Sequence, residues 1–411
     1  MTPAIVAIFA LVYLGMILGG LPFLQLDRTG IALLGAIALV GLGAVSLEEA
    51  SRSIHLPTLV LLFSFMVISA QMRLGGFYAW VTRRVAELPV SPPLLLGALI
   101  AVAALLSAVF SNDVVCLAAA PVLADACLRR GLDPVPYLLG LACAANVGSA
   151  ATLIGNPQNM LIGETLRLSF GGYFLEAIVP VGLGLLATWG LIVLLERGRW
   201  RLTEPAFAAA AERREDAELD RWQSVKGLSV AAVLVAVFLL APWPREVAAL
   251  TGAGLLLMSR KLHSNKMLGL VDWELLVLFI GLFVVNHAMQ QTGLPAGAVA
   301  MLAGAGVHLA EPAPLFAATF VLSNVVSNVP AVMLLLPLAT EPMDGPLLAL
   351  VSTLAGNLLI VGSIANIIVV GAAARRGIVI DWKRHARVGV PVTVVTLAIS
   401  AAWLWWRLPA V

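Results

Sequence analysis

Apolar runs of about 20 residues recur along the whole chain, and no other feature restricts its fold so strongly. A run of that length crosses the hydrocarbon core of a bilayer as a helix. Of the 411 residues, 61% are hydrophobic and only 12% are charged, which is about half the charge of a typical soluble domain. The sequence therefore predicts an all-α polytopic membrane protein, with the lipid bilayer and no nucleic acid as a partner.

Polar residues interrupt the apolar runs at two places in each half of the chain. The breaks read Ser111-Asn112-Asp113 and Gly155-Asn156-Pro157-Gln158-Asn159 in the first half, and Ser327-Asn328-Val329-Pro330 and Gly362-Ser363-Ile364-Ala365-Asn366 in the second. Ser111 and Pro121 correspond to Ser327 and Pro337 at one offset of 216 residues. An unpaired backbone group at membrane depth costs several kcal/mol against lipid, so each break must face protein, water or a ligand.

The order of spans and breaks is the same in both halves, which predicts an internal repeat. The predicted spans are 3–24, 30–47, 56–72, 134–166, 173–196, 227–242, 246–258, 273–291, 346–374 and 389–406, with 134–166 and 346–374 broken, and the predicted re-entrant hairpins are 93–129 and 311–340. Residues 1–196 and 227–411 then each hold five spans and one hairpin, with scaffold spans within 3–72 and 227–291, and the polar segment 197–226 joins them. An odd number of spans per half inverts the second half, so we expect an inverted-topology repeat.

The distribution of positive charge sets the expected orientation. With the 197–226 linker in the cytoplasm, 21 of the 25 Lys and Arg residues fall inside. This excess follows the positive-inside rule. We therefore expect a multi-pass protein of the cytoplasmic (inner) membrane with both termini external.

The residue types at the four breaks suit the binding of small ions. Hydroxyl and amide oxygens are hard ligands for Na⁺, although the same side chains can cap the helices that follow. Four helix N-termini directed at one point attract an anion, and no Lys or Arg lies near the middle of any span. We predict that the site is built from Ser111, Asn112, Asp113, Thr152, Gly155, Asn156, Pro157, Asn159, Ser327, Asn328, Gly362, Ser363 and Asn366.

Asp113 breaks the symmetry between the halves, because Val329 occupies the corresponding position. It is the only acid that this topology places near the membrane centre. An ionisable group at that depth is a functional candidate, here for binding Na⁺ or carrying a proton. The alternative is that Asp113 only caps a helix over residues 114–128.

These motifs resemble those of the ion transporter superfamily, which includes divalent-anion/sodium symporters, citrate transporters, arsenite permeases and sodium/proton antiporters. The similarity is greatest to uncharacterised bacterial citrate-transporter-like permeases and covers nearly the whole chain. In the symporter branch the hairpin tips read Ser-Asn-Thr and bind sodium together with the broken-helix loops. The resemblance thus implies one possible Na⁺ site at Ser111, Asn112 and Gly155, and another at Ser327, Asn328 and Gly362.

The departures from that branch leave the coupling ion open. Asp113 and Val329 replace the two threonines, and the Asn112-Asp113 pair is more similar to the arsenite and sodium/proton branches. The family also implies a homodimer in which hairpins and broken spans move as an elevator against a scaffold.

We therefore predict a secondary active transporter of a small inorganic or carboxylate anion, coupled to Na⁺ or H⁺ and needing no other cofactor. The main alternative is a cation/proton antiporter in which Asp113 binds the ion. A membrane-embedded enzyme is a remote alternative, because it would need a nucleophile with its base or a metal cluster at one depth. The sequence shows neither of these sets.

Overall fold

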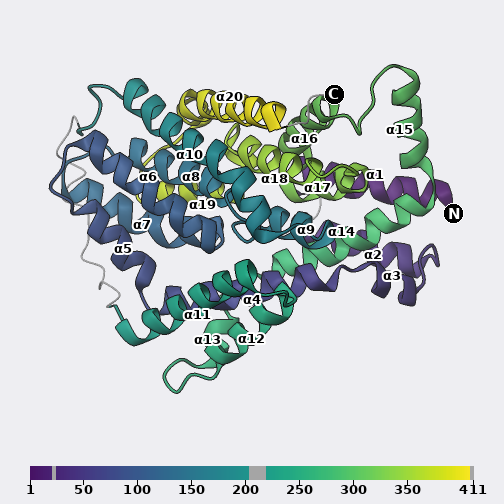
Figure 1. Ribbon diagram of the computed structural model, residues 1–411, viewed down its shortest axis with the longest axis horizontal. Coiled ribbons are helices and arrows are strands. Elements are labelled where there is room, and N and C mark those ends of the chain that lie inside the picture. The colour runs from purple at the N-terminus through teal and green to yellow at the C-terminus, as the bar shows by residue number, and fades with distance from the viewer. Residues whose placement is uncertain (21–24, 203–218, 408–411) are drawn as a thin grey trace.

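The computed structural model describes residues 1–20, 25–202 and 219–407, and these are helical throughout apart from loops and one isolated bridge (Figure 1). The predicted all-α class is confirmed. The first half contains α1 (Thr2–Leu18), α2 (Arg28–Gly41), α3 (Leu47–Ser53), α4 (Leu56–Leu74), α5 (Phe77–Ala86), α6 (Pro92–Val109), α7 (Asn112–Arg129), α8 (Pro134–Ser149), α9 (Pro157–Thr165) and α10 (Phe170–Leu195). The second half contains α11 (Arg221–Leu240), α12 (Arg245–Leu257), α13 (Ser264–Leu268), α14 (Trp273–Gln291), α15 (Leu294–Gly304), α16 (Pro312–Val326), α17 (Asn328–Leu335), α18 (Asp344–Ala355), α19 (Ile364–Ala374) and α20 (Trp382–Arg407), with short 3₁₀ turns η2 (Leu336–Leu338) and η3 (Ile360–Gly362).

The two halves present the same series of helices in the same order. The short helices α3 and α13 were not predicted, and they occupy equivalent places in the two series. Gly76 and Gly293, the N-caps of α5 and α15, both adopt left-handed backbone conformations, with φ of 70° and 71°. Glycine adopts this conformation without steric cost, so both series make the same sharp turn at the same point.

Helices of the first half pack against helices of the second half. In the outer part, α2 packs along α14 and α4 packs along α12, while α10 and α20 lie side by side. In the inner part, α7 packs on α19 and α17 packs on α9. The second helix of each hairpin therefore contacts the second half of the other half's broken span, which brings the four breaks together.

α8 is the central helix of this inner part, because every residue from Pro134 to Ser149 is buried. Small side chains make this possible. A Cβ at Gly148 would overlap Ala104 of α6, so only a glycine lets these two helices approach so closely.

Several helix bounds differ from the predicted spans. α1 ends at Leu18 rather than near residue 24, and residues 21–24 lie outside the described part. α2 ends at Gly41 rather than at residue 47, because the chain turns at Gly43, where φ is 67°. The apolar residues that follow Gly41 lie in a loop, so hydropathy alone extended this span too far.

Polar residues also start two helices earlier than hydropathy predicts. Asp220 caps α11 through the Gln223 N–H at 3.2 Å, so the helix begins inside the predicted linker 197–226. Asp381 accepts a hydrogen bond from the Arg384 N–H at 2.7 Å as α20 begins, well before the predicted residue 389. Most of the predicted linker, residues 203–218, lies outside the described residues, as do residues 408–411 at the C-terminus, which we expected to be external.

Six helices of the described chain are long and apolar enough to cross a membrane, which supports a multi-pass protein. They are α4, α6, α10, α11, α14 and α20. Ten spans were predicted, but α1, α2 and α12 are shorter than 18 residues and the two broken spans divide into shorter helices. α6 reaches this length although it was predicted as one arm of a hairpin.

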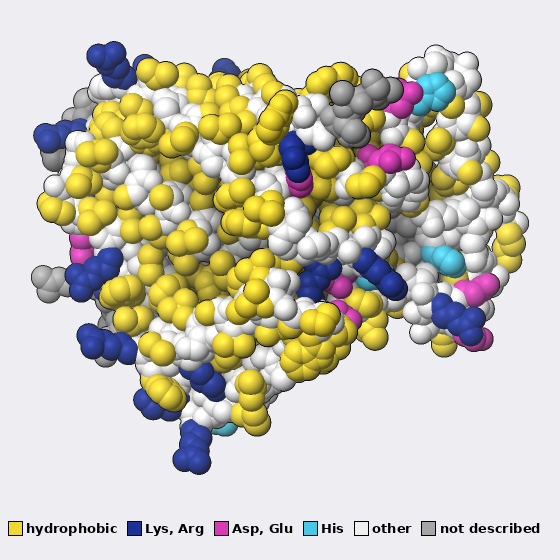
Figure 2. Space-filling model, viewed as in Figure 1, with side chains coloured by type: hydrophobic (Ala, Val, Ile, Leu, Met, Phe, Trp, Pro, Cys, Tyr) yellow, Lys and Arg dark blue, Asp and Glu magenta, His cyan; other side chains and the backbone are white. Residues whose placement is uncertain are grey.

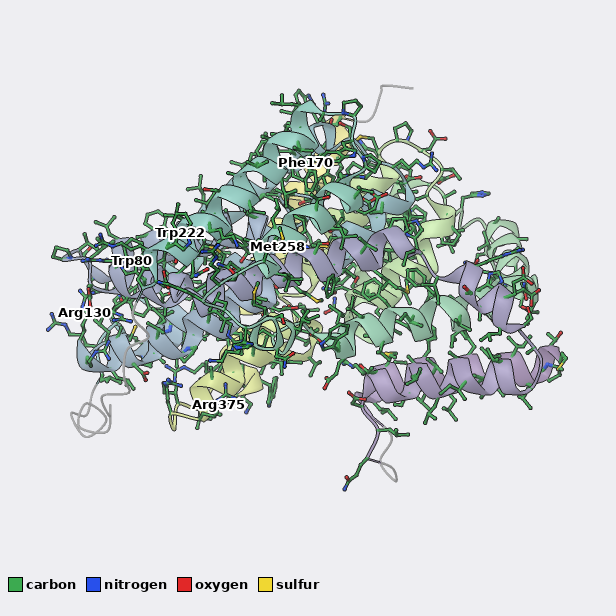
Figure 3. All side chains as sticks on the ribbon, turned by 90° about the horizontal axis from the view of Figure 1, so that it is seen from below. Trp80, Arg130, Phe170, Trp222, Met258 and Arg375 are labelled. Atoms are coloured by element: carbon green, nitrogen blue, oxygen red, sulfur yellow. The ribbon has the colours of Figure 1, made fainter. Side chains whose placement is uncertain are left out.

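The surface agrees with a lipid environment. Figure 2 shows hydrophobic side chains over most of the visible face, with Lys and Arg side chains gathered along its left and lower-left edge. Figure 3 shows Arg130 and Arg375, which follow α7 and α19, to the left of Phe170, the first residue of α10. The C-terminal ends of the paired helices α7 and α19 thus lie toward the basic end of the molecule.

Candidate functional site

The structure brings the four predicted breaks to one small cavity. This cavity has a volume of about 40 Å³. Its lining comes from both hairpin tips, both broken spans and one scaffold helix, namely Asn112, Asp113, Pro157, Gln158, Leu275, Ser327, Asn328, Val329, Gly362, Ser363 and Ile364. The two tips, 216 residues apart in the sequence, therefore face each other across it.

Four helices begin at this cavity. Asn112, Pro157, Asn328 and Ile364 are the first residues of α7, α9, α17 and α19, and all four line it. A helix N-terminus carries a partial positive charge and unpaired N–H groups, so their convergence favours an anion or another hydrogen-bond acceptor. None of the lining residues is Lys, Arg or His.

Three side-chain oxygens from the two tips are buried and make no hydrogen bond with a described residue. They are Oδ1 of Asn112, Oδ1 of Asp113 and Oδ1 of Asn328. A buried polar atom without a partner costs about 1–3 kcal/mol, so such atoms are rare unless a ligand satisfies them. Their presence together at one cavity makes it the candidate site, and each of these oxygens could accept from a hydrogen-bond donor or contact a cation.

The capping interpretation of the tips is wrong in this structure. Ser111 and Ser327 occupy the N-cap positions of α7 and α17, but neither side chain makes a capping hydrogen bond. Asp113 lies inside the first turn of α7, so it is not the N-cap of a helix over residues 114–128. The two serine side chains at the tips are thus not used to cap the helices that follow them.

Two serines and one asparagine near the tips were not among the site residues predicted from the sequence. Ser107 and Ser323 precede the tips by one helical turn, and both side-chain hydroxyls are buried without a partner among the described residues. Their separation is the repeat offset of 216 residues, which was the available signal. Asn324 Oδ1 is also unpartnered, but Ala108 occupies the corresponding position, so the two tips differ.

Six predicted site residues are not part of the cavity lining, namely Ser111, Thr152, Gly155, Asn156, Asn159 and Asn366, and the last two of these close the loops of the broken spans. Asn159 Nδ2 donates to the Thr152 carbonyl at 3.1 Å, and Asn366 Nδ2 donates to the Leu359 carbonyl at 3.0 Å, seven residues back in each case. Asn156 Oδ1 accepts from the Asn159 N–H at 2.9 Å and caps α9. The Nδ2 groups of Asn159 and Asn366, which were predicted to be part of the site, therefore close the loops of the two breaks.

Thr152 joins the first broken span to the first hairpin. Its hydroxyl donates to the Ala108 carbonyl at 2.5 Å, one turn before the tip. Ser363 makes the equivalent cap to that of Asn156, accepting from the Ala365 N–H at 3.2 Å. A side-chain N-cap thus begins the second helix of both broken spans.

Asn146 of α8 links the two halves through contacts with the lining residues Asn112 and Ser363, and it was not among the predicted site residues. Its Oδ1 accepts from Asn112 Nδ2 at 3.0 Å and from the Ser363 hydroxyl at 2.9 Å. Its Nδ2 donates to Asn357 Oδ1 at 2.8 Å, across 211 residues of sequence. An asparagine in an otherwise apolar helix was the only available signal, and its partners depend on the packing of both halves.

Gly155 and Gly362 allow the chain to cross itself at the two breaks. A Cβ at Gly155 would overlap the Ser149 carbonyl, and a Cβ at Gly362 would lie 3.1 Å from the Gly356 carbonyl oxygen. The Gly155 carbonyl also accepts from the Asn112 backbone N–H at 3.3 Å. The first tip is therefore attached to the first break through the backbone.

Ser327 has a strained backbone at the second tip. Its φ of 79° and ψ of 161° fall in a region that is essentially restricted to glycine. Ser111, at the corresponding position of the first tip, has an ordinary φ of −52°. Such strain costs about 1–3 kcal/mol and is typical of functional sites.

The fold is that of a membrane transporter. The structure superposes on the crystal structure of the YdaH transporter of Alcanivorax borkumensis with a TM-score of 0.54 and 16% sequence identity, covering 98% of this chain and 97% of the other. The shared fold and the six apolar helices thus define a multi-pass membrane protein.

The chain belongs to the citrate transporter family (CitMHS), whose profile matches residues 7–355. It is 30% identical to an uncharacterised transporter of Mycobacterium tuberculosis, over 93% of this chain and 94% of that protein. It is 29% identical to the silicon efflux transporter LSI3 of Oryza sativa subsp. japonica, over 95% of each chain. The family resemblance seen in the motifs is confirmed.

Proposed function

We propose that the protein is a secondary active transporter that moves a small anion across the membrane in exchange for, or together with, Na⁺ or H⁺. The observation that supports this most directly is the cavity where four helix N-termini meet three unpartnered side-chain oxygens. In a protein that only spans lipid, such unpaired polar groups at the junction of the two halves would cost free energy without any function.

The chemistry of the lining explains why transport needs a coupling ion. The helix N-termini attract an anion, whereas a charged Asp113 repels it, and no basic side chain of the lining compensates. A cation or a proton bound near Asp113 removes this repulsion. Binding of the anion and of the coupling ion would then depend on each other, as coupled transport requires.

A small substrate suits the cavity in this state. A volume of about 40 Å³ holds only a few water-sized groups, which favours a small substrate over a large one. One relative is named for the efflux of silicon, and the family is named for citrate. We favour a small inorganic or carboxylate anion, such as a single oxyanion.

The repeated features of the two halves support an inverted-topology repeat that works by alternating access. Asn159 and Asn366 each donate to a carbonyl seven residues back in the chain. α7 packs on α19 and α17 packs on α9, so equivalent helices of the two halves have equivalent partners. We propose that the hairpins and broken spans form the mobile unit, that α1–α5 and α11–α15 form the scaffold of a homodimer, and that the mobile unit moves as an elevator. In the inner membrane, the basic ends of α7 and α19 would face the cytoplasm and both termini the outside.

A cation/proton antiporter remains the second candidate, and one observation favours it. Asp113 lines the cavity with an unpartnered carboxylate oxygen, and no basic side chain contributes to the lining. An antiporter would bind Na⁺ or H⁺ at Asp113 without any anion.

One experiment distinguishes the two candidates. Purified protein would be reconstituted into proteoliposomes, and uptake of radiolabelled small anions would be measured under an imposed Na⁺ gradient, an imposed pH gradient, or neither. Gradient-dependent accumulation of an anion supports the proposal. Exchange of Na⁺ for H⁺ that no anion in the panel stimulates, with no anion uptake, would refute it in favour of the antiporter.

A further inference from the structure

A second, larger hollow lies where α10 ends and α20 begins, outside the candidate transport site. Its volume is about 420 Å³. Its lining includes four basic residues and two acidic ones, namely Arg199, Lys383, Arg384, Arg387, Glu196 and Asp381. The hollow therefore has an excess of positive charge.

Three of the four basic residues form no ion pair within the part of the chain that the structure describes. Arg384 pairs with Asp133 at 2.6 Å, and Arg387 donates to the Leu195 carbonyl at 2.7 Å, which holds its guanidinium against the end of α10. Among the described residues, Arg199, Lys383 and Arg387 form no ion pair with a carboxylate. An anion that enters the hollow therefore meets three cations that form no ion pair with any described carboxylate.

The helices that flank the hollow are strongly apolar on their outer sides. α10 exposes Leu194 (70%) and Leu186 (65%), and α20 exposes Val394 (58%). The two helices lie side by side (Figure 1), so an apolar surface continues from the basic hollow along the body of the molecule. A molecule that fits both features has an anionic head and hydrocarbon chains.

Trp382 places the hollow at the boundary between lipid and water. Its ring is 69% exposed, and Lys383 Nζ lies 5.6 Å from the ring centroid. Exposed tryptophans and basic residues at helix ends are typical of the headgroup region of a membrane.

We propose that this hollow binds the phosphate headgroup of an anionic phospholipid, with the acyl chains against the exposed sides of α10 and α20. Guanidinium groups bind phosphate oxygens through paired, charge-assisted hydrogen bonds. Basic pockets between membrane helices attract anionic headgroups in this way. Free phosphate shares the headgroup chemistry but would leave the apolar surface unused. The proposal depends on α10 and α20 lying in the membrane and not on the proposed transport activity.

A headgroup bound at the start of α20 would also affect the candidate transport site, because α20 contacts the second break. His385, in the first turn of α20, is buried, and its Nε2 lies 3.1 Å from the Asn357 carbonyl oxygen in the second break. Asn357 in turn accepts from Asn146, which contacts Asn112 at the first tip. Fixing the start of α20 would therefore steady both breaks, so we expect anionic lipid to raise the thermal stability of the protein.

The test compares lipid binding by two variants with equal loss of charge. One variant carries Arg199→Gln, Lys383→Gln and Arg387→Gln. Its control carries Arg260→Gln, Lys261→Gln and Lys266→Gln, which removes three cations from the α12–α13 region on the same predicted side of the membrane. Delipidated protein in micelles would be titrated with phosphatidylglycerol, cardiolipin and phosphatidylcholine, and bound lipid would be counted by native mass spectrometry.

We expect wild type and control to retain an anionic lipid in excess phosphatidylcholine, and the hollow variant to bind it at least about ten-fold more weakly. Arg199→Lys with Arg387→Lys preserves the charge but removes the paired guanidinium hydrogen bonds, so its binding should lie between that of wild type and that of the hollow variant, which separates loss of the site from misfolding. Equal weakening in the hollow variant and the control would overturn the proposal, because it would show only general attraction to charge. Displacement of the lipid by millimolar inorganic phosphate would also overturn it, in favour of a site for the free anion.

Discussion

The strained backbone of Ser327 allows a matched pair of substitutions to test whether the second tip is built for function. At Ser327, where φ is 79°, replacement by glycine removes the steric conflict, which is worth about 1–3 kcal/mol. At Ser111, where φ is −52°, the same replacement relieves nothing and adds only the entropic cost of glycine, about 0.5–1 kcal/mol. Because the entropic cost of glycine is the same in both variants, Ser327→Gly should be more stable than Ser111→Gly by the strain that it relieves, about 1–3 kcal/mol.

The assay is the free energy of unfolding of both variants and of wild type in mixed micelles, with proteoliposome transport measured in parallel. Ser327 lines the cavity, so we expect Ser327→Gly to lose transport although it is more stable than Ser111→Gly. Equal stabilities, or a less stable Ser327→Gly, would show that the Ser327 backbone is not strained. Full transport by Ser327→Gly would show that its hydroxyl and fixed geometry have no role.

Three further predictions concern the breaks. Asn112→Ala and Asn328→Ala should each abolish transport but leave folding intact, since neither Oδ1 atom has a partner and the one hydrogen bond that Asn112→Ala removes, from Nδ2 to Asn146, contributes only about 0.5–1.5 kcal/mol; wild-type uptake by both variants would refute the assignment of the site. Gly155→Ala should reduce the yield of folded protein severely, whereas Gly362→Ala should fold with a small loss, because the added Cβ would overlap the Ser149 carbonyl in the first case and lie 3.1 Å from the Gly356 oxygen in the second; size-exclusion profiles of the two variants measure this, and equal yields would contradict it. Asp113→Asn keeps the shape of the side chain but not its charge, so it should lose its response to an imposed Na⁺ or pH gradient; accumulation equal to wild type would leave Asp113 without a role in coupling.

The sequence by itself determined the class of protein and the positions of the breaks. Both are local properties, because an apolar run of membrane length excludes a soluble fold and a Ser-Asn or Gly-Asn-Pro sequence interrupts a helix wherever it occurs. The bounds of α6 to α9 and α16 to α19 accordingly lie close to the predicted hairpins and broken spans. Span lengths were less accurate near α2 and α11, where a glycine turn and an aspartate cap override hydropathy.

Only the tertiary structure decided which polar groups at the breaks are available to a ligand. Asn159 and Asn112 are alike in the sequence, but the first turns back to bond its own loop while the second leaves an oxygen unpartnered at the cavity. The role of Asn146 depends on Asn357, 211 residues away. The partner of a side chain is set by which distant segments pack against it, and that packing is a property of both halves of the chain together.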